Sequence, residues 1–179
     1  MKLKTNPTDE IKAALDKCEA IEASLLKEAK FLSDSSAELN ALQKSIDVSD
    51  TAQVQRMTTL LTISQVGVPR RTYRHQEAES AKTALVDCGR GFTSGALAPR
   101  LRDIETRIRA RVEEKLKPHF PEAGALRIAS NHSTELSALA SIQQQAVIRD
   151  YSGDGAVRQA KLLLEAWGAA DAFELQHLG

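Results

Sequence analysis

The sequence predicts an all-α protein, a helical bundle with a long N-terminal coiled-coil-like helix, and two apolar patterns support this fold class. In the first pattern, an apolar residue or cysteine recurs every seven positions for six terms: Ile11, Cys18, Leu25, Leu32, Leu39 and Ile46. Seven residues make two turns of a slightly under-wound helix, so these side chains form one seam that needs a partner surface. In the second pattern, apolar residues recur every three or four positions: Leu97, Leu101, Ile104, Ile108, Val112 and Leu116.

The first element is expected to be a helix over residues 9–48. The positions three and four after each seam residue are apolar at both ends of this segment and polar in its middle, which disfavours a simple two-stranded zipper. Leu26 and Phe31 lie off the seam and widen the apolar stripe, as in a helix that contacts more than one neighbour. The segment 35–38, Ser-Ser-Ala-Glu, has the form of a capping box, so a hairpin broken near residues 33–36 is the alternative. The unbroken register of the seam favours one continuous helix.

Between the two stripes, the sequence predicts two shorter helices. Asp50 is a capping side chain with Gln53 placed to reach back, and the helix that starts there is expected to end near residue 65. The β-branched run at residues 58–63 makes a short strand the alternative. The segment 66–69, Val-Gly-Val-Pro, is expected to end this element, and a further helix is expected over residues 70–88. The glycines of residues 89–95 then predict a loop.

After the second stripe, prolines at 118 and 121 are expected to stop the helix, and residues 122–132 are expected to be irregular, with a short extended piece at residues 126–128. Ser133 predicts the cap of a further helix. A turn at residues 151–155 is expected to separate it from another helix, which Gly168 interrupts before a last turn or two. In the resulting organisation, residues 1–48 form the long amphipathic helix or helical hairpin, and residues 49–179 form a bundle that packs with it.

Basic charge is concentrated in the middle third of the chain. Residues 66–120 carry 12 basic and 7 acidic groups, net +5, whereas the whole chain is neutral. Because arginine side chains suit phosphates, nucleic acid or another polyanion is a candidate partner. The candidate contacts are Arg70, Arg71, Arg74, Arg100, Arg107 and Arg111. We favour a different interpretation, in which the arginines along residues 97–116 face an acidic helix, and the N-terminal helix is the expected neighbour.

Three short motifs suggest chemistry, and each has a simpler structural explanation. Residues 150–155 match the first half of a calcium-binding loop, but Lys161 occupies the position that needs a bidentate carboxylate. Glu174 and His177 have the spacing of a di-iron ligand pair, which requires a second such pair elsewhere in the chain. The glycines of residues 89–95 lack the Gly-Lys-Ser/Thr ending of a nucleotide-binding loop. We therefore predict no metal and no cofactor.

The remaining composition indicates an interaction protein of the cytoplasm. The two cysteines, Cys18 and Cys88, lie in helical patterns and are expected to be reduced thiols, and neither has a histidine close in sequence, so we do not expect an enzyme. The N-terminus lacks the apolar run of a signal peptide, and the longest uncharged runs are too short to span a bilayer. The sequence thus predicts a non-catalytic structural or interaction subunit, which forms a homo-oligomer or binds a helical protein partner through the two seams.

Overall fold

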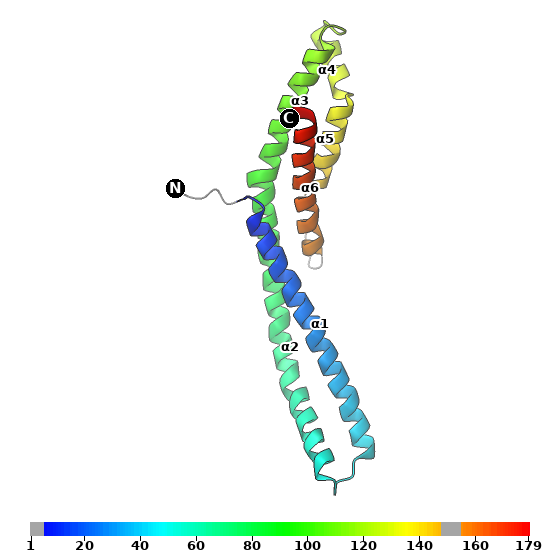
Figure 1. Ribbon diagram of the computed structural model, residues 1–179. Coiled ribbons are helices and arrows are strands. Elements are labelled where there is room, and N and C mark those ends of the chain that lie inside the picture. Colours follow the sequence, from blue (N-terminus) through cyan, green and yellow to red (C-terminus); the bar gives the residue numbers. More distant parts are fainter. Residues whose placement is uncertain (1–5, 148–154) are drawn as a thin grey trace, which may run out of the picture. The chain divides into compact units, whose positions relative to one another are not determined.

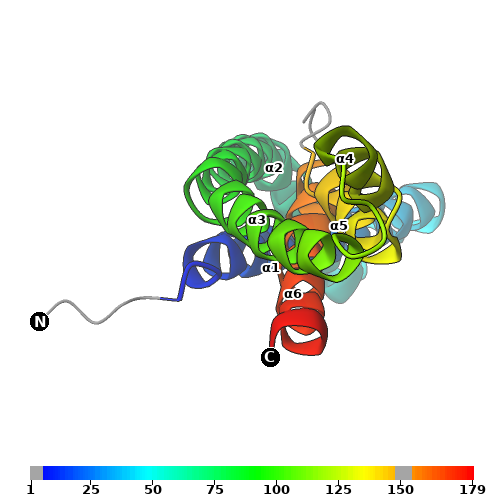
Figure 2. The same cartoon turned by 90° about the horizontal axis from the view of Figure 1, so that it is seen from above.

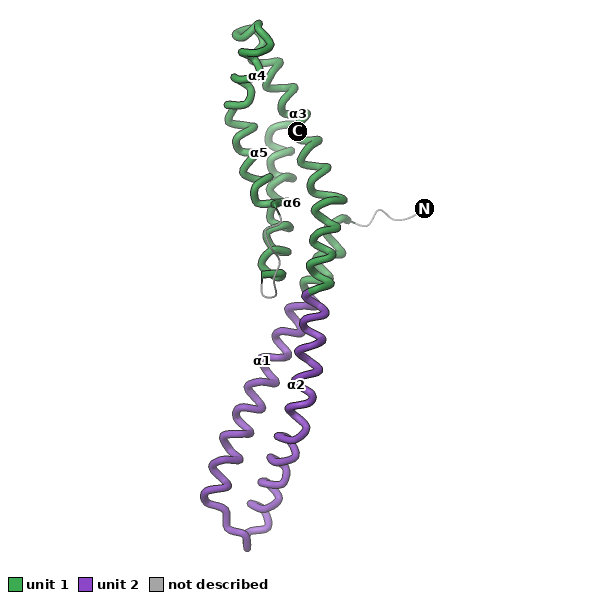
Figure 3. The backbone as a smooth tube through the Cα atoms, turned by 180° about the vertical axis from the view of Figure 1, so that it is seen from behind, with its two compact units in different colours: residues 1–15, 83–179 green, residues 16–82 purple. Residues whose placement is uncertain are grey.

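A computed structural model describes residues 6–147 and 155–179, and every regular element in these ranges is helical (Figure 1). The elements are α1 (Asp9–Ser45), α2 (Thr51–Phe92), the π-helix η1 (Thr93–Leu97), α3 (Ala98–Leu116), α4 (Ala123–Asn131), α5 (Thr134–Gln145) and α6 (Gly155–Leu178). The all-α class and the long N-terminal helix are therefore confirmed. Residue contacts group the chain into two compact units, which we call the helical hairpin (residues 16–82) and the bundle unit (residues 1–15 and 83–179) (Figure 3). A domain boundary after residue 48 stays a prediction.

The N-terminal helix α1 is unbroken, as the register of the seam predicted. Residues 33–36 lie inside it, and Ser35 is buried instead of capping a second helix. The helix begins where Asn6 caps the chain. Asn6 Oδ1 accepts a hydrogen bond from the Thr8 N–H at 3.2 Å, and the Asn6 carbonyl accepts one from the Asp9 N–H at 2.9 Å. The alternative of a helix broken near residues 33–36 is thereby excluded.

The start of α2 is fixed by the predicted cap. Asp50 Oδ1 accepts hydrogen bonds from the backbone N–H groups of Ala52, at 2.9 Å, and Gln53, at 3.3 Å. The side chain of Gln53 reaches back across the connection and accepts a hydrogen bond from the Asp47 N–H at 3.0 Å. Side chains therefore satisfy backbone donors at both ends of the connection between α1 and α2.

The second helix runs without a break to Phe92, so the predicted end at residues 65–69 is wrong. Pro69 lies inside α2, where it removes one backbone hydrogen bond and its ring crowds the preceding turn. Leu60 before the proline and Ala78 after it are both buried. Because this packing holds the helix on both sides of Pro69, it outweighs the local preference for a break.

Two further local signals are overruled in this part of the chain. The β-branched run at residues 58–63 is helical, and three of its threonine hydroxyls donate to carbonyls four residues earlier at 2.9–3.0 Å. The predicted loop at residues 89–95 is wrong as well, since α2 passes through η1 directly into α3. There the hydroxyl of Thr93 donates to the Gly89 carbonyl at 2.8 Å. Side-chain hydroxyls thus bond to backbone carbonyls where the sequence suggested a strand or a loop.

In the bundle unit, α3 is the central helix and contacts η1, α4, α5 and α6 (Figure 2). Its predicted apolar stripe is buried from Leu101 to Val112, and Leu97 of η1 is fully covered. The buried side of α6 consists mainly of small residues: Ala156, Ala160, Leu163, Ala166, Ala170 and Phe173. Small side chains let the backbone of α6 approach α3 closely. The apolar stripe of α3 is therefore covered by helices of its own unit.

The C-terminal helices both confirm and correct the sequence prediction. The predicted cap of α5 is confirmed, because Ser133 Oγ accepts a hydrogen bond from the Leu136 N–H at 3.2 Å. The predicted extended piece at residues 126–128 is wrong, since it lies inside α4, where Leu126 and Ser130 share one covered side at helical spacing. The predicted interruption of α6 at Gly168 is also wrong. The predicted turn at residues 151–155 lies outside the described residues apart from its last member.

Replacing Asp50 with alanine is expected to lower the free energy of unfolding by about 1 kcal/mol, because two N–H groups at the start of α2 lose their acceptor. Chemical denaturation followed by circular dichroism measures the loss. Gln55→Ala is the matched control, since Gln55 is exposed one turn further along the same helix. An equal loss in both variants would contradict the capping role.

Candidate interaction surface on the helical hairpin

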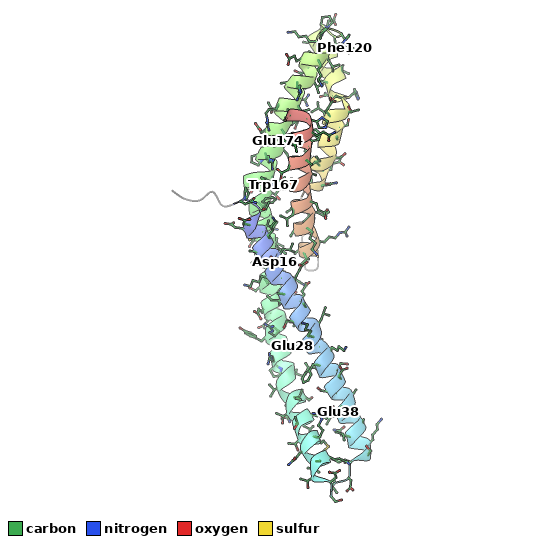
Figure 4. The ribbon with its side chains drawn as sticks, in the orientation of Figure 1. Asp16, Glu28, Glu38, Phe120, Trp167 and Glu174 are labelled. Atoms are coloured by element: carbon green, nitrogen blue, oxygen red, sulfur yellow. The ribbon has the colours of Figure 1, made fainter. Side chains whose placement is uncertain are left out.

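In the helical hairpin, α1 and α2 run antiparallel (Figure 3), and Glu28 and Glu38 lie along α1 (Figure 4). Ion pairs connect these carboxylates to arginines of α2. Arg56 makes two bonds of 2.6 Å to the Glu38 carboxylate. Arg70 and Arg74 reach Glu28 at 3.4 and 3.7 Å. The hydrogen bond from Arg56 holds the pKa of Glu38 below its ordinary value. Because these groups lie near water, the ion pairs set the alignment of the helices more than their stability.

Gly67 lets Leu32 lie directly against the backbone of α2. A Cβ atom placed on Gly67 would lie 2.4 Å from Leu32 Cδ2, far inside van der Waals contact. Glycine inside a helix costs about 1 kcal/mol relative to alanine. The contact with Leu32 therefore explains why glycine suits a position where helix propensity disfavours it.

Two open grooves in the hairpin share Leu32 and Ile63 as lining residues. The first, which we call the apolar groove, has a volume of about 520 Å³ and is lined by Lys27, Glu28, Phe31, Leu32, Thr62, Ile63, Val66, Gly67 and Arg70. The second has a volume of about 540 Å³ and is lined largely by serine, threonine, arginine and histidine side chains. The two grooves therefore differ in chemistry, and the first offers a surface for apolar groups.

Large apolar side chains are exposed around the apolar groove. Phe31 of α1 is 58% exposed and Val66 of α2 is 59% exposed. Tyr73, which does not line the groove, lies about two turns beyond Val66 on the same side of α2 and is 68% exposed. Single exposed apolar residues are common, but several around one concave surface are typical of a binding site. The apolar groove is therefore the candidate functional site.

The predicted N-terminal seam is buried unevenly. Three of its members are buried and three are partly covered: Ile11, Cys18 and Leu39 in the first group, and Leu25, Leu32 and Ile46 in the second. One antiparallel neighbour covers only one stripe of a helix, so part of the apolar surface stays open. Burial raises the pKa of the Cys18 thiol. Because the thiolate is the nucleophilic form, a thiol with a raised pKa suits packing better than catalysis.

The second predicted seam lies inside the bundle unit. Five of its members are buried and the last is partly covered: Leu97, Leu101, Ile104, Ile108 and Val112, and then Leu116. The elements that contact α3 there are η1, α4, α5 and α6. This seam therefore forms the core of the bundle unit, whereas the seam of α1 is only partly covered.

Arg100 and Arg107 of α3 converge on α6. Arg100 pairs with Asp171 and, at 2.9 Å, with Glu174, and its guanidinium carbon lies 4.4 Å from the ring centre of Trp167. Arg107 pairs with the same Glu174 carboxylate; Figure 4 shows Trp167 and Glu174 on α6. The prediction that these arginines face the acidic N-terminal helix is therefore wrong. The partner is α6, and the feature of the sequence that could have indicated it is the pair of carboxylates Asp171 and Glu174, three residues apart on that helix.

The other arginines proposed as polyanion contacts also have acceptors within the molecule. Arg70 and Arg74 form ion pairs with Glu28, and Arg74 also donates to Glu77 and Ser24. Arg71 approaches the ring of His75 at 3.4 Å, and Arg111 donates to the His177 carbonyl. On α1, Glu22 likewise pairs with Lys82 of α2 at 3.5 Å. The charges of Arg70, Arg74 and Lys82 are thus compensated across the two helices of the hairpin.

The remaining motifs are placed as follows. Glu174 is engaged by two arginines, and the ring of His177 stacks on Phe173 with centres 4.4 Å apart. Residues 150–154 of the calcium-loop motif lie outside the described residues. Within the described ranges, no three histidine, cysteine, aspartate or glutamate side chains gather closely enough to hold a metal ion. None of the described helices combines the length and the apolar character that crossing a membrane requires.

Comparisons of the chain with protein-family models, with curated proteins and with solved structures give no match. What the protein can do is therefore inferred from its own geometry, and the apolar groove is the feature with the clearest chemical consequence.

Gly67→Ala is expected to be more favourable in a Leu32→Ala background than in the wild-type chain. In the wild type, the added methyl group forces Leu32 out of its position, whereas the truncated side chain leaves room for it. A double-mutant cycle measured by chemical denaturation should give a coupling of about 0.5–1.5 kcal/mol. Additive effects of the two substitutions would show that Gly67 and Leu32 do not constrain each other.

Glu174→Gln is expected to lower stability at neutral pH and to have little effect in acid. Hydrogen bonds from Arg100 and then Arg107 lower the pKa of Glu174. A carboxyl whose folded-state pKa is depressed adds stability above its unfolded pKa of about 4.3, and this stability is lost as the pH falls through the folded pKa. The expected loss at pH 7 is up to about 1 kcal/mol.

Urea denaturation of both proteins at about pH 7 and pH 3 measures this difference, which should shrink at the lower pH. Glu165→Gln, an exposed carboxylate on the same helix, is the control. A difference between Glu174→Gln and the wild type that is the same at both pH values would show that the ion pairs with Arg100 and Arg107 add nothing to stability.

Proposed function

We propose that this protein is a non-catalytic helical subunit that assembles with a protein partner through the apolar groove of the helical hairpin. The exposure of Phe31 and Val66 by more than half, beside an open groove floored by Leu32 and Ile63, is the observation that carries this proposal. Two antiparallel helices leave apolar surface in water, and covering it with a further helix would release that surface from water. A helix laid in an apolar groove is a common mode of recognition.

The charge distribution supports assembly over polyanion binding. Arg70 and Arg74 already pair with Glu28, and Arg100 and Arg107 already pair with Glu174. A phosphate that bound these guanidinium groups would have to displace their carboxylate partners. The free thiols Cys18 and Cys88 suit a reducing compartment, so we place the assembly in the cytoplasm as part of this proposal.

A photoreactive benzoylphenylalanine at position 31 is expected to form a covalent adduct with a protein partner on irradiation, because this position borders the groove that the partner covers. Cells that produce the protein naturally provide the setting, and a gel shift detected with an antibody to this chain is the measurement. The same probe at position 26 is the matched control, since Leu26 is a large apolar residue of α1 that is 74% exposed and lies outside both grooves.

The proposal requires clearly more adduct at position 31 than at position 26. No protein adduct at position 31, or equal amounts at both positions, would overturn the assignment of the apolar groove as the binding surface. The mass of the adduct also reports whether the partner is a second copy of this chain or another protein.

A further inference from the structure

Building on the proposed function, we infer that the occupant of the apolar groove is a second copy of the same hairpin. The two copies stack face to face and antiparallel about a twofold axis. Phe31 lies close to this axis, and Lys27 of each copy faces Asp34 of the other. The inference commits to one partner and one orientation, and it is carried by the pattern of charges around the groove.

A ridge of α1 has residues spaced by four, three and four: Lys27, Phe31, Asp34 and Glu38. The first two line the apolar groove, and the ridge continues past it along α1. At 100° per residue, these four positions fall within an arc of about 60° on the helix surface. Lys27, Phe31 and Asp34 are all exposed. The ridge therefore carries a positive charge on one side of an exposed aromatic ring and negative charges on the other side.

A surface of this kind is complementary to its own copy turned by half a revolution. In an isologous interface, if one residue contacts a second residue of the other copy, the reciprocal contact also forms. Setting Lys27 opposite Asp34 places the axis between residues 30 and 31. Ala20 then falls opposite Ala41, and Ala23 falls opposite Glu38. Each of these pairs contains at least one small side chain, and none of them brings like charges together.

The parallel alternative brings like charges together. In a parallel stack about a twofold axis along the hairpin, α1 of one copy would lie over α2 of the other. Lys27 and Arg70 line the same groove from the two helices. Each Lys27 would therefore approach Arg70 of the other copy, and like charges across an interface are strongly disfavoured. The contacts of Lys27 thus favour the antiparallel arrangement, in which this residue meets Asp34 and not Arg70.

The apolar residues fit the same arrangement. Phe31, more than half exposed in one hairpin, enters the groove of the other copy, where Leu32, Ile63 and Val66 are available as apolar contacts. The groove volume of about 520 Å³ gives an aromatic side chain room to enter. Two stacked hairpins make a four-helix arrangement, which also covers the partly open seam residue Leu32.

The test uses the full chain with reciprocal charge reversals, Lys27→Glu and Asp34→Lys. Each single variant places like charges together twice in its own dimer, and the dissociation constant should rise about tenfold or more. A mixture of the two variants places opposite charges together at both contacts, so heterodimers should form with an affinity close to that of the wild type. Light scattering gives the masses, and native mass spectrometry separates the heterodimer from the homodimers.

Three controls accompany the mixing experiment. The double variant Lys27→Glu/Asp34→Lys should regain the wild-type affinity. Lys44→Glu, which reverses a charge on an exposed residue of α1 away from the ridge, should leave the affinity unchanged. Circular dichroism of every variant shows whether the hairpin remains folded, so a loss of dimer is separated from a loss of structure.

Each outcome decides between the two proposals. Restoration of affinity in the mixture supports the antiparallel dimer. A wild-type chain that stays monomeric at about 100 μM, or a mixture no tighter than the single variants, overturns it. If the chain is monomeric but the probe at position 31 captures a different protein, the proposed function stands and the self-association inference fails. If the chain is monomeric and the probe captures nothing, both fail.

Discussion

The antiparallel seam between α1 and α2 is the constraint on which the hairpin depends. Each helix covers one stripe of the other, and the stripe is too narrow to enclose all the apolar side chains that the two helices carry. Leu39 is buried in the seam, Leu32 is partly covered, and Phe31 stands mostly in water. The ion pairs of Glu38 and Glu28 align the two helices without covering this surface. Charged side chains thus align the two helices, whereas apolar side chains cover each other's surface. Within one hairpin this apolar surface is only partly covered.

The bundle unit satisfies its apolar surface in a different way. Its central helix α3 has three neighbouring helices, and its stripe from Leu101 to Val112 is enclosed. Arg100 lies between the ring of Trp167 and the carboxylates of α6, so a residue that resembles a phosphate ligand in the sequence serves to join two helices. The central apolar stripe is therefore enclosed in the bundle unit, whereas Leu32 and Phe31 of the hairpin are only partly covered or exposed.

The sequence predicted those features that depend on neighbours along the chain. The seven-residue register predicted an unbroken α1, and the side chains of Asp50 and Ser133 predicted the starts of α2 and α5. The sequence-based prediction was wrong where packing between residues distant in the chain decides whether a helix continues. Pro69 and the glycines of residues 89–95 are strong local signals for a break, yet buried residues on both sides hold the helix.

The apolar groove could not be predicted from local sequence patterns either. The sequence placed Phe31 off the seam, but it gave no means of knowing that Val66 and Ile63 would line the same groove, because this depends on how two helices distant in sequence are aligned. In the same way, the sequence suggested only a metal-ligand spacing for Glu174, which we did not take as a site, and it did not indicate the partner Arg107, 67 residues earlier in the chain. A charged residue has many possible partners of opposite charge in the sequence, and only the folded structure shows which of them lies beside it.

The position of Pro69 within α2 has a mechanical consequence for the groove. Proline deprives the carbonyl of Gln65 of its usual donor, and Gly67, two residues earlier, adds no side chain to brace the same turn. Stiffness in a helix comes from its ladder of backbone bonds, so α2 yields most readily to bending at this turn. The compliant turn forms part of the groove wall, while the bridges of Arg56 and Lys82 lie on either side of it along the hairpin. The wall can therefore adjust its curvature to an incoming surface while the two ends of the hairpin keep their alignment.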